Sequence, residues 1–270
     1  MFKLINKVKE INPLVLHYTN EVTINDCANI TLALGASPLM SYSNEEVEEI
    51  ISIVGSVVIN IGTMNSDRLD LFLQAGRAAN KFNKPVILDP VGVFATKTRT
   101  DFTNKLLNEI KFDVVKGNIA EIKFIGGLDV RGKGVDSFDD GEDISEVIKK
   151  VAKKLNCIVV ATGKVDFISD GEDVIKIFNG TSKLKSVTGT GCMTGSLIGS
   201  YLGAYNGLQD RERENFKKIE AVAMGVLTMG VSGELADKNN IAIGSFKEEL
   251  MNNVYEMSSN KLKEYGRIEY

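Results

Sequence analysis

Short runs of consecutive apolar residues recur along the first two thirds of the chain. The runs are Ser56–Ile61, Pro85–Pro90, Asp113–Lys116 and Cys157–Ala161. Val and Ile without polar alternation are typical of strands that are covered on both faces. Between the runs, the stretches with helical spacing are Glu45–Val54, Asp67–Phe82 and Asp143–Leu155. Ser43 or Asn44 would cap the first of them. Alternating strands and helices predict a mostly parallel sheet with right-handed crossovers and helices on both faces.

The pattern changes after the fourth run. Asp166–Ser169 and Val174–Phe178 flank Asp170-Gly171, a strong hairpin signal, so we expect antiparallel strands at one edge of the sheet. The last third has helical spacing over 191–205, 212–236 and 245–264. Glycines recur every four residues from 191 to 203, which favours close packing of that helix against the sheet. No linker or internal repeat is visible, so residues 1–270 are predicted to form one α/β domain.

Composition narrows the class of protein. The chain has 270 residues, 43% of them hydrophobic, enough for a sizeable core without disulfides or structural metals. The net charge of −4 and the lack of a basic tract argue against a nucleic-acid partner. No run of about 20 apolar residues predicts a membrane span, and the N-terminus does not resemble a signal peptide. A cytoplasmic enzyme is therefore the expected class.

The cysteine and histidine content excludes several kinds of site. The three cysteines, Cys27, Cys157 and Cys192, form no Cys-x-x-Cys pair, and their odd number argues against a disulfide framework. His17 is the only histidine. A histidine metal cluster, or a Ser-His-Asp triad elsewhere in the chain, is therefore excluded.

The sequence Thr-Gly-Thr-Gly-Cys-Met-Thr-Gly at 188–195 precedes a long apolar stretch. Consecutive backbone N–H groups in a glycine turn that opens onto a helix N-terminus bind phosphate or a developing anion. Cys192 would lie at that point, where the positive end of a helix favours the thiolate form of cysteine. The arrangement suits group transfer onto a small molecule, with phosphoryl transfer as the leading candidate.

Two common nucleotide motifs match poorly. Thr194 stands where a dinucleotide-binding Gly-x-Gly-x-x-Gly turn beginning at Gly189 needs its third glycine. The segment from Gly127 to Lys133 resembles a P-loop, but Gly134 replaces the metal-binding hydroxyl residue. A charged surface loop is the better interpretation of that segment.

Polar residues follow three of the predicted strands, and ligands of open α/β sheets bind at the carboxyl ends of strands. Asp89, Lys116 and Thr162 lie at these ends, with Glu121 one turn into the next helix. The carboxylates of Asp89 and Glu121 could hold Mg²⁺ directly or through water, and Lys116 could contact phosphate oxygens. Each residue also has a structural interpretation: a turn residue, a first-turn helix acid or a solvated strand end. Cys192 could likewise be a small buried hydrophobe, as we expect for the other two cysteines.

Six segments in this order resemble the hydroxyethylthiazole kinase family, the thiamine-salvage members of the ribokinase-like superfamily. They are Thr19–Asn29, Gly35–Ser41, Asn60–Met64, Leu88–Gly92, Lys116–Glu121 and Thr188–Cys192. The resemblance covers nearly the whole chain. It implies a ribokinase-like three-layer sandwich, and an ATP-dependent, Mg²⁺-requiring phosphorylation of 4-methyl-5-(2-hydroxyethyl)thiazole to its monophosphate.

The resemblance also implies roles for particular residues. Met40 and Gly189 would contact the thiazole, Lys116 and Thr162 would contact ATP, and Asp89 and Glu121 would serve the metal. Cys192 takes the position of the aspartate base of most ribokinase-like kinases. The implied assembly is a homotrimer with the thiazole pocket between neighbouring subunits. Phe94 departs from the family pattern, where smaller residues are commoner, and puts the packing of its loop in question.

Three other functions stay open at this point. A hydroxymethylpyrimidine kinase would share the fold but carry aspartate in place of Cys192. A cysteine-nucleophile hydrolase would need a base near Cys192, and His17 is the only imidazole. A non-catalytic thiazole- or nucleotide-binding protein would be expected to have lost Asp89 or Glu121, and both are present.

Overall fold

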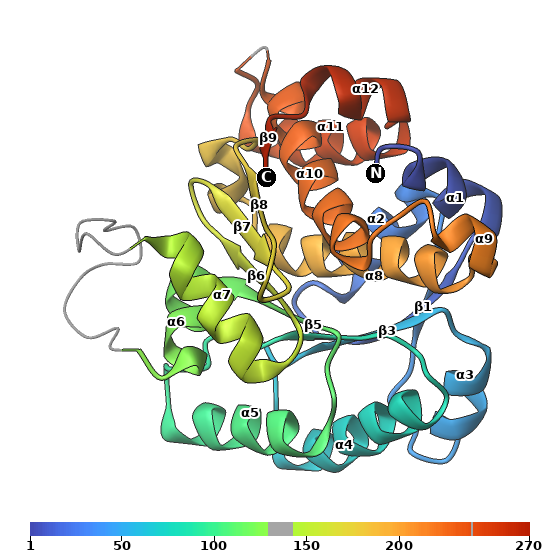
Figure 1. The fold of residues 1–270 in the computed structure, drawn as a ribbon, viewed down its shortest axis with the longest axis vertical. Helices are drawn as coiled ribbons and strands as arrows, with labels where there is room; N and C mark the ends of the chain where they lie inside the picture. The colour runs from blue at the N-terminus through green and yellow to red at the C-terminus, as the bar shows by residue number, and fades with distance from the viewer. Residues whose placement is uncertain (129–142, 239) are drawn as a thin grey trace.

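The computed structural model describes residues 1–128, 143–238 and 240–270 (Figure 1). The P-loop-like segment that begins at Gly127 falls, from residue 129 on, outside the described residues. The strands are β1 Leu14–Tyr18, β2 Ser37–Met40, β3 Ser56–Asn60, β4 Val86–Asp89, β5 Val114–Asn118, β6 Ile158–Thr162, β7 Asp166–Ser169, β8 Val174–Ile177 and β9 Ile268–Glu269. The helices are α1 Leu4–Ile11, α2 Ile24–Leu34, α3 Val47–Ile53, α4 Ser66–Lys81, α5 Lys97–Glu109, α6 Ile119–Gly126, α7 Ile144–Leu155, α8 Thr190–Asn206, α9 Asp210–Arg213, α10 Lys218–Asp237, α11 Ile243–Tyr255 and α12 Ser259–Tyr265, with a 3₁₀ turn at Ser182–Ser186.

The strands of the described residues form one sheet of nine, in the order β2-β1-β3-β4-β5-β6-β7-β8-β9. Strands β1 to β6 are parallel, and β7, β8 and β9 add an antiparallel edge, as the hairpin signal predicts. The register places Asn60 beside Asp89 and Asn118 beside Thr162. The polar residues at the strand ends are therefore neighbours along one edge of the sheet.

Helices cover both faces of the sheet, which gives three layers (Figure 1). One core cluster joins one face to α1, α2, α8, α10, α11 and α12, and the other joins the opposite face to α3, α4, α5, α6 and α7. Successive strand residues alternate between the clusters: Val57 belongs to one and Val58 to the other. Both faces are buried, which accounts for the unbroken apolar runs of β3 to β6.

The glycines of α8 let this helix lie close to the sheet. A Cβ at Gly199 would be 2.9 Å from Cγ2 of Val58, and one at Gly203 would be 3.0 Å from Cβ of Pro13. Any side chain at these two positions would push the helix away from the strands. The close packing predicted from the glycine spacing is confirmed.

Some predicted boundaries differ from the structure. The stretch expected as a helix over 212–236 is divided into α9 and α10, and the Glu220 carboxylate accepts the Lys217 N–H at the start of α10. The stretch over 245–264 is divided where the Ser258 side chain accepts the N–H of Lys261 and caps α12. The expected cap of α3 was wrong: the helix begins after Glu46, and the Ser43 hydroxyl donates to the Glu45 carboxylate.

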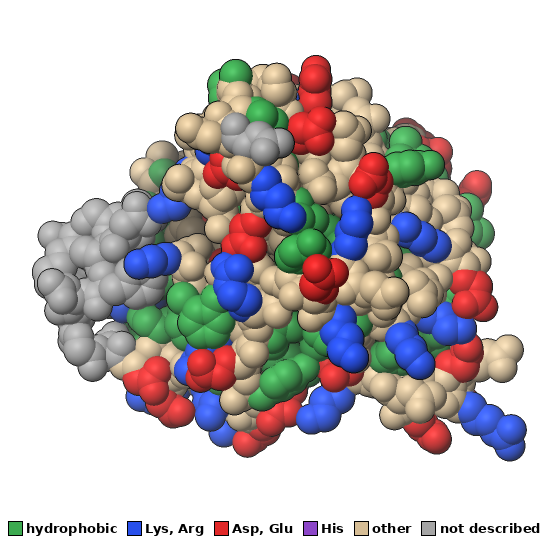
Figure 2. Space-filling model, turned by 90° about the horizontal axis from the view of Figure 1, so that it is seen from above, with side chains coloured by type: hydrophobic (Ala, Val, Ile, Leu, Met, Phe, Trp, Pro, Cys, Tyr) green, Lys and Arg blue, Asp and Glu red, His purple; other side chains and the backbone are tan. Residues whose placement is uncertain are grey.

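The long helix α10 is apolar enough to cross a membrane by length and composition, yet 83% of its most apolar window is buried inside the protein. It is therefore a central core helix. On the face shown in Figure 2, Lys and Arg side chains are interspersed with Asp and Glu and do not gather in one patch.

Candidate active site

The glycine turn before α8 has the geometry that the sequence predicts. Gly189 caps the helix with φ of 91°, in the left-handed region, and a Cβ there would lie 2.5 Å from Cγ2 of Thr23. Position 189 therefore requires glycine. The first intrahelical bond runs from the Met193 N–H to the Gly189 carbonyl, which leaves the amides of the first turn, including Cys192, free of intrahelical partners. Such amides, together with the helix dipole, can bind an anion.

The sulfur of Cys192 lies between two asparagine side chains. Nδ2 of Asn20 is 3.2 Å from Sγ, and Nδ2 of Asn60 is 3.3 Å from Sγ. Asn20 follows β1 and Asn60 ends β3. The chain leaves β1 toward β2 on one side and returns to β3 on the other, so these strand ends form a topological switch point, where ligands of open α/β sheets bind.

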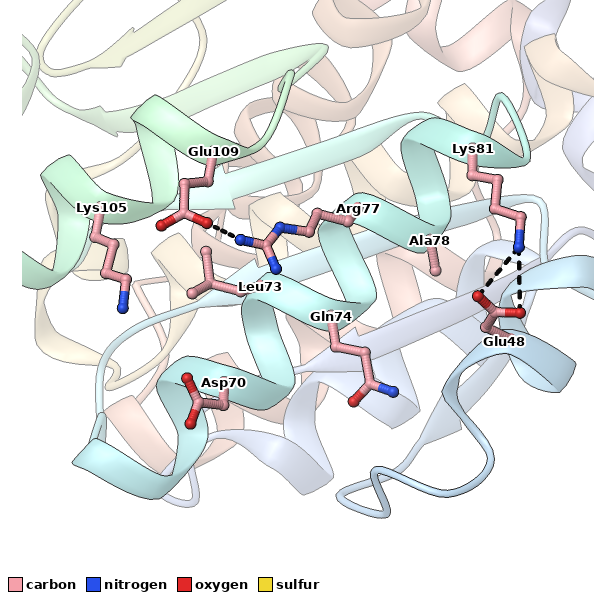
Figure 3. A pocket seen from close by; sticks show the side chains of 9 residues that line it. All are labelled: Glu48, Asp70, Leu73, Gln74, Arg77, Ala78, Lys81, Lys105 and Glu109. Carbon is pink, nitrogen blue, oxygen red and sulfur yellow. Dashed lines mark hydrogen bonds and ion pairs between the residues drawn. The ribbon is translucent and has the colours of Figure 1, made fainter.

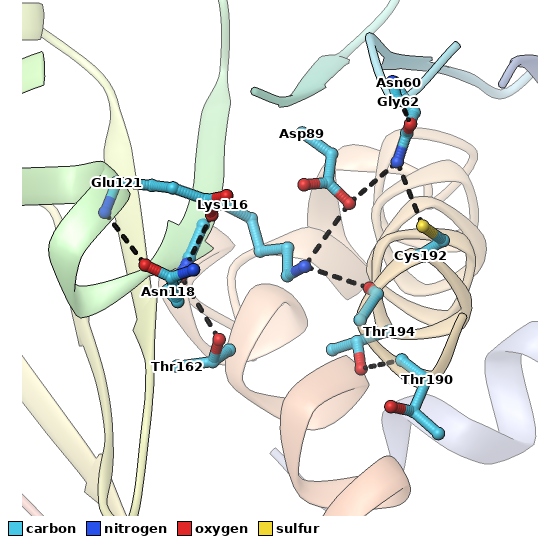
Figure 4. Close-up of polar contacts among 12 residues, drawn as sticks. Asn60, Gly62, Asp89, Lys116, Asn118, Glu121, Thr162, Thr190, Cys192 and Thr194 are labelled. Atoms are coloured by element: carbon cyan, nitrogen blue, oxygen red, sulfur yellow. Dashed lines mark hydrogen bonds and ion pairs between the residues drawn. The ribbon is translucent and has the colours of Figure 1, made fainter. Parts of the chain in front are cut away.

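Asp89 and Lys116 continue the cluster of polar side chains around Cys192 toward the middle of the sheet (Figure 4). Nδ2 of Asn60 donates to Oδ2 of Asp89 over 2.9 Å, and Nζ of Lys116 is 3.3 Å from the same oxygen. The ammonium also donates to the Gly191 carbonyl over 3.0 Å. Contacts therefore run from Cys192 through Asn60, Asp89 and Lys116 back to the first turn of α8.

The structure excludes the interpretation of Lys116 as a solvated strand end, because only 4% of the residue is exposed. Burial acts to lower the pKa of its ammonium, but the nearby carboxylates of Asp89 and Glu121 outweigh burial and raise that pKa. Lys116 is therefore a fixed buried cation beside the N-terminus of α8.

Glu121 combines a structural role with a position near Asp89. Its Oε1 accepts the Gly92 N–H and its Oε2 accepts the Asn118 N–H, each over 2.8 Å. The second bond completes a capping box at the start of α6. Burial, and then the charge of Asp89, raise the pKa of the Glu121 carboxyl, while the two backbone bonds oppose that rise.

The carboxylates of Asp89 and Glu121 fit a metal site that water and substrate phosphates complete, and not an all-protein metal cage. Within residues 1–128, 143–238 and 240–270, no three His, Cys, Asp or Glu side chains converge as an all-protein metal cage. Mg²⁺ is more often held by one or two carboxylates, with water and substrate phosphates completing the shell. Two carboxylates that influence each other electrostatically, next to a helix N-terminus, suit this second kind of site.

A cavity of about 960 Å³ opens beside these residues. Its polar wall includes Asn118, Thr162 and Thr190, and its apolar wall includes Val226 and Met229 of α10. Cavities of this size hold nucleotide-sized ligands. The Thr162 hydroxyl donates to the Gly117 carbonyl over 3.2 Å, which ties the ends of β5 and β6 together.

Asp166, which no motif of the sequence marks, also lines this cavity. Its carboxylate accepts the Gly163 N–H over 2.9 Å. Burial raises the pKa of Asp166 to about 7, against the lowering effects of that bond and of Lys116. The only sequence signal for it was its place as the first residue of the predicted hairpin.

A second hollow, of about 520 Å³, lies over α4 and contains mostly charged side chains (Figure 3). Arg77 pairs with Glu109, and Lys81 pairs with Glu48. These charges neutralise one another at the surface. None of the strand-end residues lines it.

Met40 comes from a different strand than the residues around Cys192. It ends β2, the edge strand, in register with His17 of β1, and is half-buried. Asn20 and Asn60 contact Cys192, and neither was predicted as a site residue, although both belong to segments of the resemblance. Phe94, the departure from the family pattern, packs against Phe124 of α6 with ring centroids 6.0 Å apart.

The other two cysteines differ from Cys192 in surroundings. Cys27 is buried and Cys157 is half-buried. Burial raises the pKa of the Cys27 thiol to about 11 and that of Cys157 to about 12. Both are therefore protonated at neutral pH and unsuited to nucleophilic chemistry.

Comparisons with known proteins identify the family and the fold of the chain. A model of the "Hydroxyethylthiazole kinase family" matches residues 5–260. A hydroxyethylthiazole kinase from Clostridioides difficile is 62% identical over 270 residues, which are all of this chain and 99% of the relative. The solved structure of hydroxyethylthiazole kinase from Pyrococcus horikoshii has a TM-score of 0.86 and 33% identity, and the match covers 99% of this chain and 97% of that one. A ribokinase-like superfamily protein from Enterococcus faecalis shares the fold, with a TM-score of 0.64 and 12% identity over 96% of this chain and 95% of that one.

Proposed function

The chain belongs to the hydroxyethylthiazole kinase family, and from this premise we propose that it transfers the γ-phosphoryl group of ATP to the hydroxyl of 4-methyl-5-(2-hydroxyethyl)thiazole. One observation of the structure supports the activity most directly. The N-terminus of α8, with Cys192 in its first turn, contacts a buried Asp89–Lys116 pair beside a cavity of about 960 Å³. The product, a thiazole monophosphate, belongs to thiamine salvage.

ATP would occupy the large cavity. Its base and ribose would lie against the apolar wall of α10, and its phosphates would extend toward Thr162 and Lys116. Lys116 is suited to this role because the nearby carboxylates keep its ammonium charged against the effect of burial, and because its buried side chain is held in place. A phosphate that arrives at this ammonium gives it an anionic partner in addition to Asp89.

Asp89 and Glu121 would hold Mg²⁺ together with the phosphates, directly or through water. When bound, the cation offsets charge on the phosphoryl oxygens. Asp89 keeps its carboxylate oriented through Asn60 and Lys116. Glu121 keeps the loop after β4 close to the start of α6 through Gly92 and Asn118.

Phosphoryl transfer passes through a loose transition state, so that positioning and neutralisation of charge contribute most of the catalysis. The free amides from Gly189 to Cys192 would stabilise the transferring group. Cys192 would accept or orient the proton of the substrate hydroxyl. A thiol is a modest general base at neutral pH, so we assign Cys192 a small share of the rate enhancement.

The thiazole ring would contact Met40 and Gly189. Met40 lies on the edge strand β2, so this pocket needs a further wall. We propose that a neighbouring subunit of a homotrimer supplies it. The proposed location is the cytoplasm, where ATP is available.

The reaction is tested by incubating the purified protein with Mg·ATP and hydroxyethylthiazole. We expect ADP and thiazole monophosphate in equal amounts. Phosphorylation of hydroxymethylpyrimidine in preference to the thiazole would assign the chain to the pyrimidine kinases instead. Binding of both ligands without release of ADP would identify a non-catalytic binding protein.

A further inference from the structure

We propose that Asn60 is a positioning residue that couples Cys192 to Asp89 and so fixes the sulfur relative to the phosphate-binding part of the site. The proposal rests on the function proposed above, because it assigns Cys192 and Asp89 to the same reaction. It adds a residue that touches neither the nucleotide nor the transferred group in that scheme.

The side-chain amide of Asn60 uses its full hydrogen-bonding capacity. Its Oδ1 accepts the Gly62 N–H over 2.9 Å and an N–H of Asn20 over 3.0 Å. Its Nδ2 donates to Oδ2 of Asp89 over 2.9 Å and to Sγ of Cys192 over 3.3 Å. An amide has two donor hydrogens and two acceptor sites, and here each has a partner.

These partners also fix which way the amide faces. The Gly62 main-chain N–H can only donate, so the atom that faces it must be the oxygen of Asn60. The nitrogen of Asn60 then faces Asp89 and Cys192. Rotation by 180° would place the amide oxygen against the Asp89 carboxylate and would lose the bonds to Gly62, Asn20 and Asp89.

The orientation of the Asn20 side-chain amide is fixed in the same way. Its Oδ1 accepts both the N–H and the hydroxyl of Thr23, each over 3.1 Å, so its Nδ2 faces Asn60 and the sulfur. Two amide donors are therefore directed at Sγ of Cys192. Because a donor cannot face a donor, the sulfur accepts from both asparagines, and any hydrogen that it carries points away from them.

Burial strengthens the hydrogen bonds among these side chains. Asn60 and Asp89 are each 2% exposed, and Asn20 is 4% exposed. Hydrogen bonds in such surroundings are electrostatically stronger, and members of a network polarise one another. Since Oδ2 of Asp89 accepts from both Asn60 and Lys116, a change of charge near Asp89 alters the N–H that Asn60 presents to Cys192.

A double-mutant cycle tests the coupling. Asn60→Ala, Cys192→Ala and the double variant are compared with the wild type for kcat and for the KM of ATP and of hydroxyethylthiazole. We expect Asn60→Ala to lower kcat by roughly tenfold or more, with the KM of ATP changed by less than about threefold. In the Cys192→Ala background, the fold reduction of kcat caused by Asn60→Ala should be smaller by a factor of at least about five.

Asn20→Ala is a second test that removes one donor from the sulfur without removing a partner of Asp89. Its effect on kcat should also shrink in the Cys192→Ala background. The matched control is Asn80→Ala, on α4, whose amide bonds at both ends to the main chain of Lys111, each over 2.8 Å, away from the strand ends. It should keep wild-type kinetics.

The outcomes distinguish a failure of the proposed function from a failure of the proposed coupling through Asn60. If the wild type forms no thiazole monophosphate, the proposed function fails. If the wild type is active but the effects of Asn60→Ala and Cys192→Ala multiply independently, Asn60 does not act through the sulfur and the present proposal is overturned. Loss of the thermal shift induced by Mg·ATP in Asn60→Ala would assign Asn60 to ligand binding and would also overturn it.

Discussion

At the scale of single residues, the surroundings of Cys192 predict what its replacement should do. The free amides of the first turn of α8 remain when the sulfur is removed, because they belong to the main chain. Cys192→Ala should therefore lower kcat by roughly 10²-fold or less, and the KM of ATP should change little. Steady-state kinetics with varied ATP checks this prediction.

A carboxylate at position 192 would accept hydrogen bonds from the side-chain amides of Asn20 and Asn60, as the sulfur does. Cys192→Asp should therefore keep activity. A covalent mechanism predicts the opposite, with both variants inactive and a phosphocysteine on Cys192. Intact-protein mass spectrometry of the wild type under turnover distinguishes the two mechanisms.

The two carboxylates carry a separate prediction. Asp89→Ala and Glu121→Ala should each weaken the response to Mg²⁺ and lower kcat, because less charge remains to hold the cation against the phosphates. Mg²⁺ titrations of the rate measure this effect. Asp89→Ala also leaves the buried ammonium of Lys116 without its ion-pair partner, so we expect a loss of stability of about 3–5 kcal/mol. Unchanged titration curves in both variants would place the metal elsewhere.

His17 predicts a pH dependence of stability. Its imidazole is fully buried, accepts from the Ser196 hydroxyl and donates to the Val15 carbonyl, and burial lowers its pKa from 6.5 to about 4. Between these values the unfolded chain binds a proton that the folded chain does not, so the contribution of His17 to stability should fall as pH drops from 6.5 to 4. Since His17 is the only histidine, His17→Gln should remove this contribution. Urea unfolding at several pH values provides the test.

Asp166 acts with the opposite sign in the same experiment. Its pKa is raised from 3.8 to about 7 in the folded protein, so the folded chain holds a proton that the unfolded chain releases. Stability from this group is present at low pH and decreases as pH rises toward 7. In the His17→Gln variant, the remaining slope between pH 4 and 7 should therefore be negative. A positive slope in this variant would contradict the assignment of these two groups.

At the scale of elements, the sequence predicted those whose burial is uniform. Strands β3 to β6 are covered on both faces, and their apolar runs identified them. Strand β1 carries His17 and Tyr18 at its end, and β2 contains Pro38 at a sheet edge, so neither formed an apolar run that could be assigned. Strand β9 has two residues and depends on its pairing with β8, a contact between distant parts of the chain.

The glycines of α8 give a prediction at this scale. Gly199→Ala should be destabilising by about 1–3 kcal/mol, since its Cβ would contact Val58 and Val15 at 2.9 and 3.1 Å. The matched control is Gly195→Ala, whose Cβ would lie 3.8 Å from Val58, an ordinary contact. There the better helix propensity of alanine should leave stability equal or higher. Equal losses in the two variants would mean that α8 is free to shift.

At the scale of the whole molecule, the sequence predicted the site in part. Asp89, Lys116 and Thr162 were found because each lies at the end of a recognisable apolar run, although β5 continues past Lys116 to Asn118. The burial of Lys116 was not predictable, since it depends on α8, which begins about 75 residues later along the chain. The contacts of Asn20 and Asn60 with the sulfur depend on β1 lying next to β3, a neighbourhood that a local pattern does not specify.

The exposed edge of the sheet supports a prediction about assembly. Strand β2 is an edge strand; Tyr42, which follows it, is 40% exposed, and Val22, which precedes α2, is 66% exposed. Open strand edges and exposed apolar side chains are often covered by another copy of the chain. We predict a homotrimer with cyclic symmetry in which this edge meets a neighbour. Sedimentation over a range of concentrations checks it, and a fully active monomer would contradict it.

The proposed site takes its residues from Asn20 near one end of the chain and from Met229 near the other, with the first turn of α8 between them. During synthesis on the ribosome, the early strands emerge well before the helix that carries Cys192 and before α10, which walls the cavity. A nascent chain that ends ahead of α10 would therefore lack the site for ATP, whatever its strands had already formed. ATP in the surrounding solution would therefore bind and stabilise only chains that are nearly complete, because shorter chains lack part of the site.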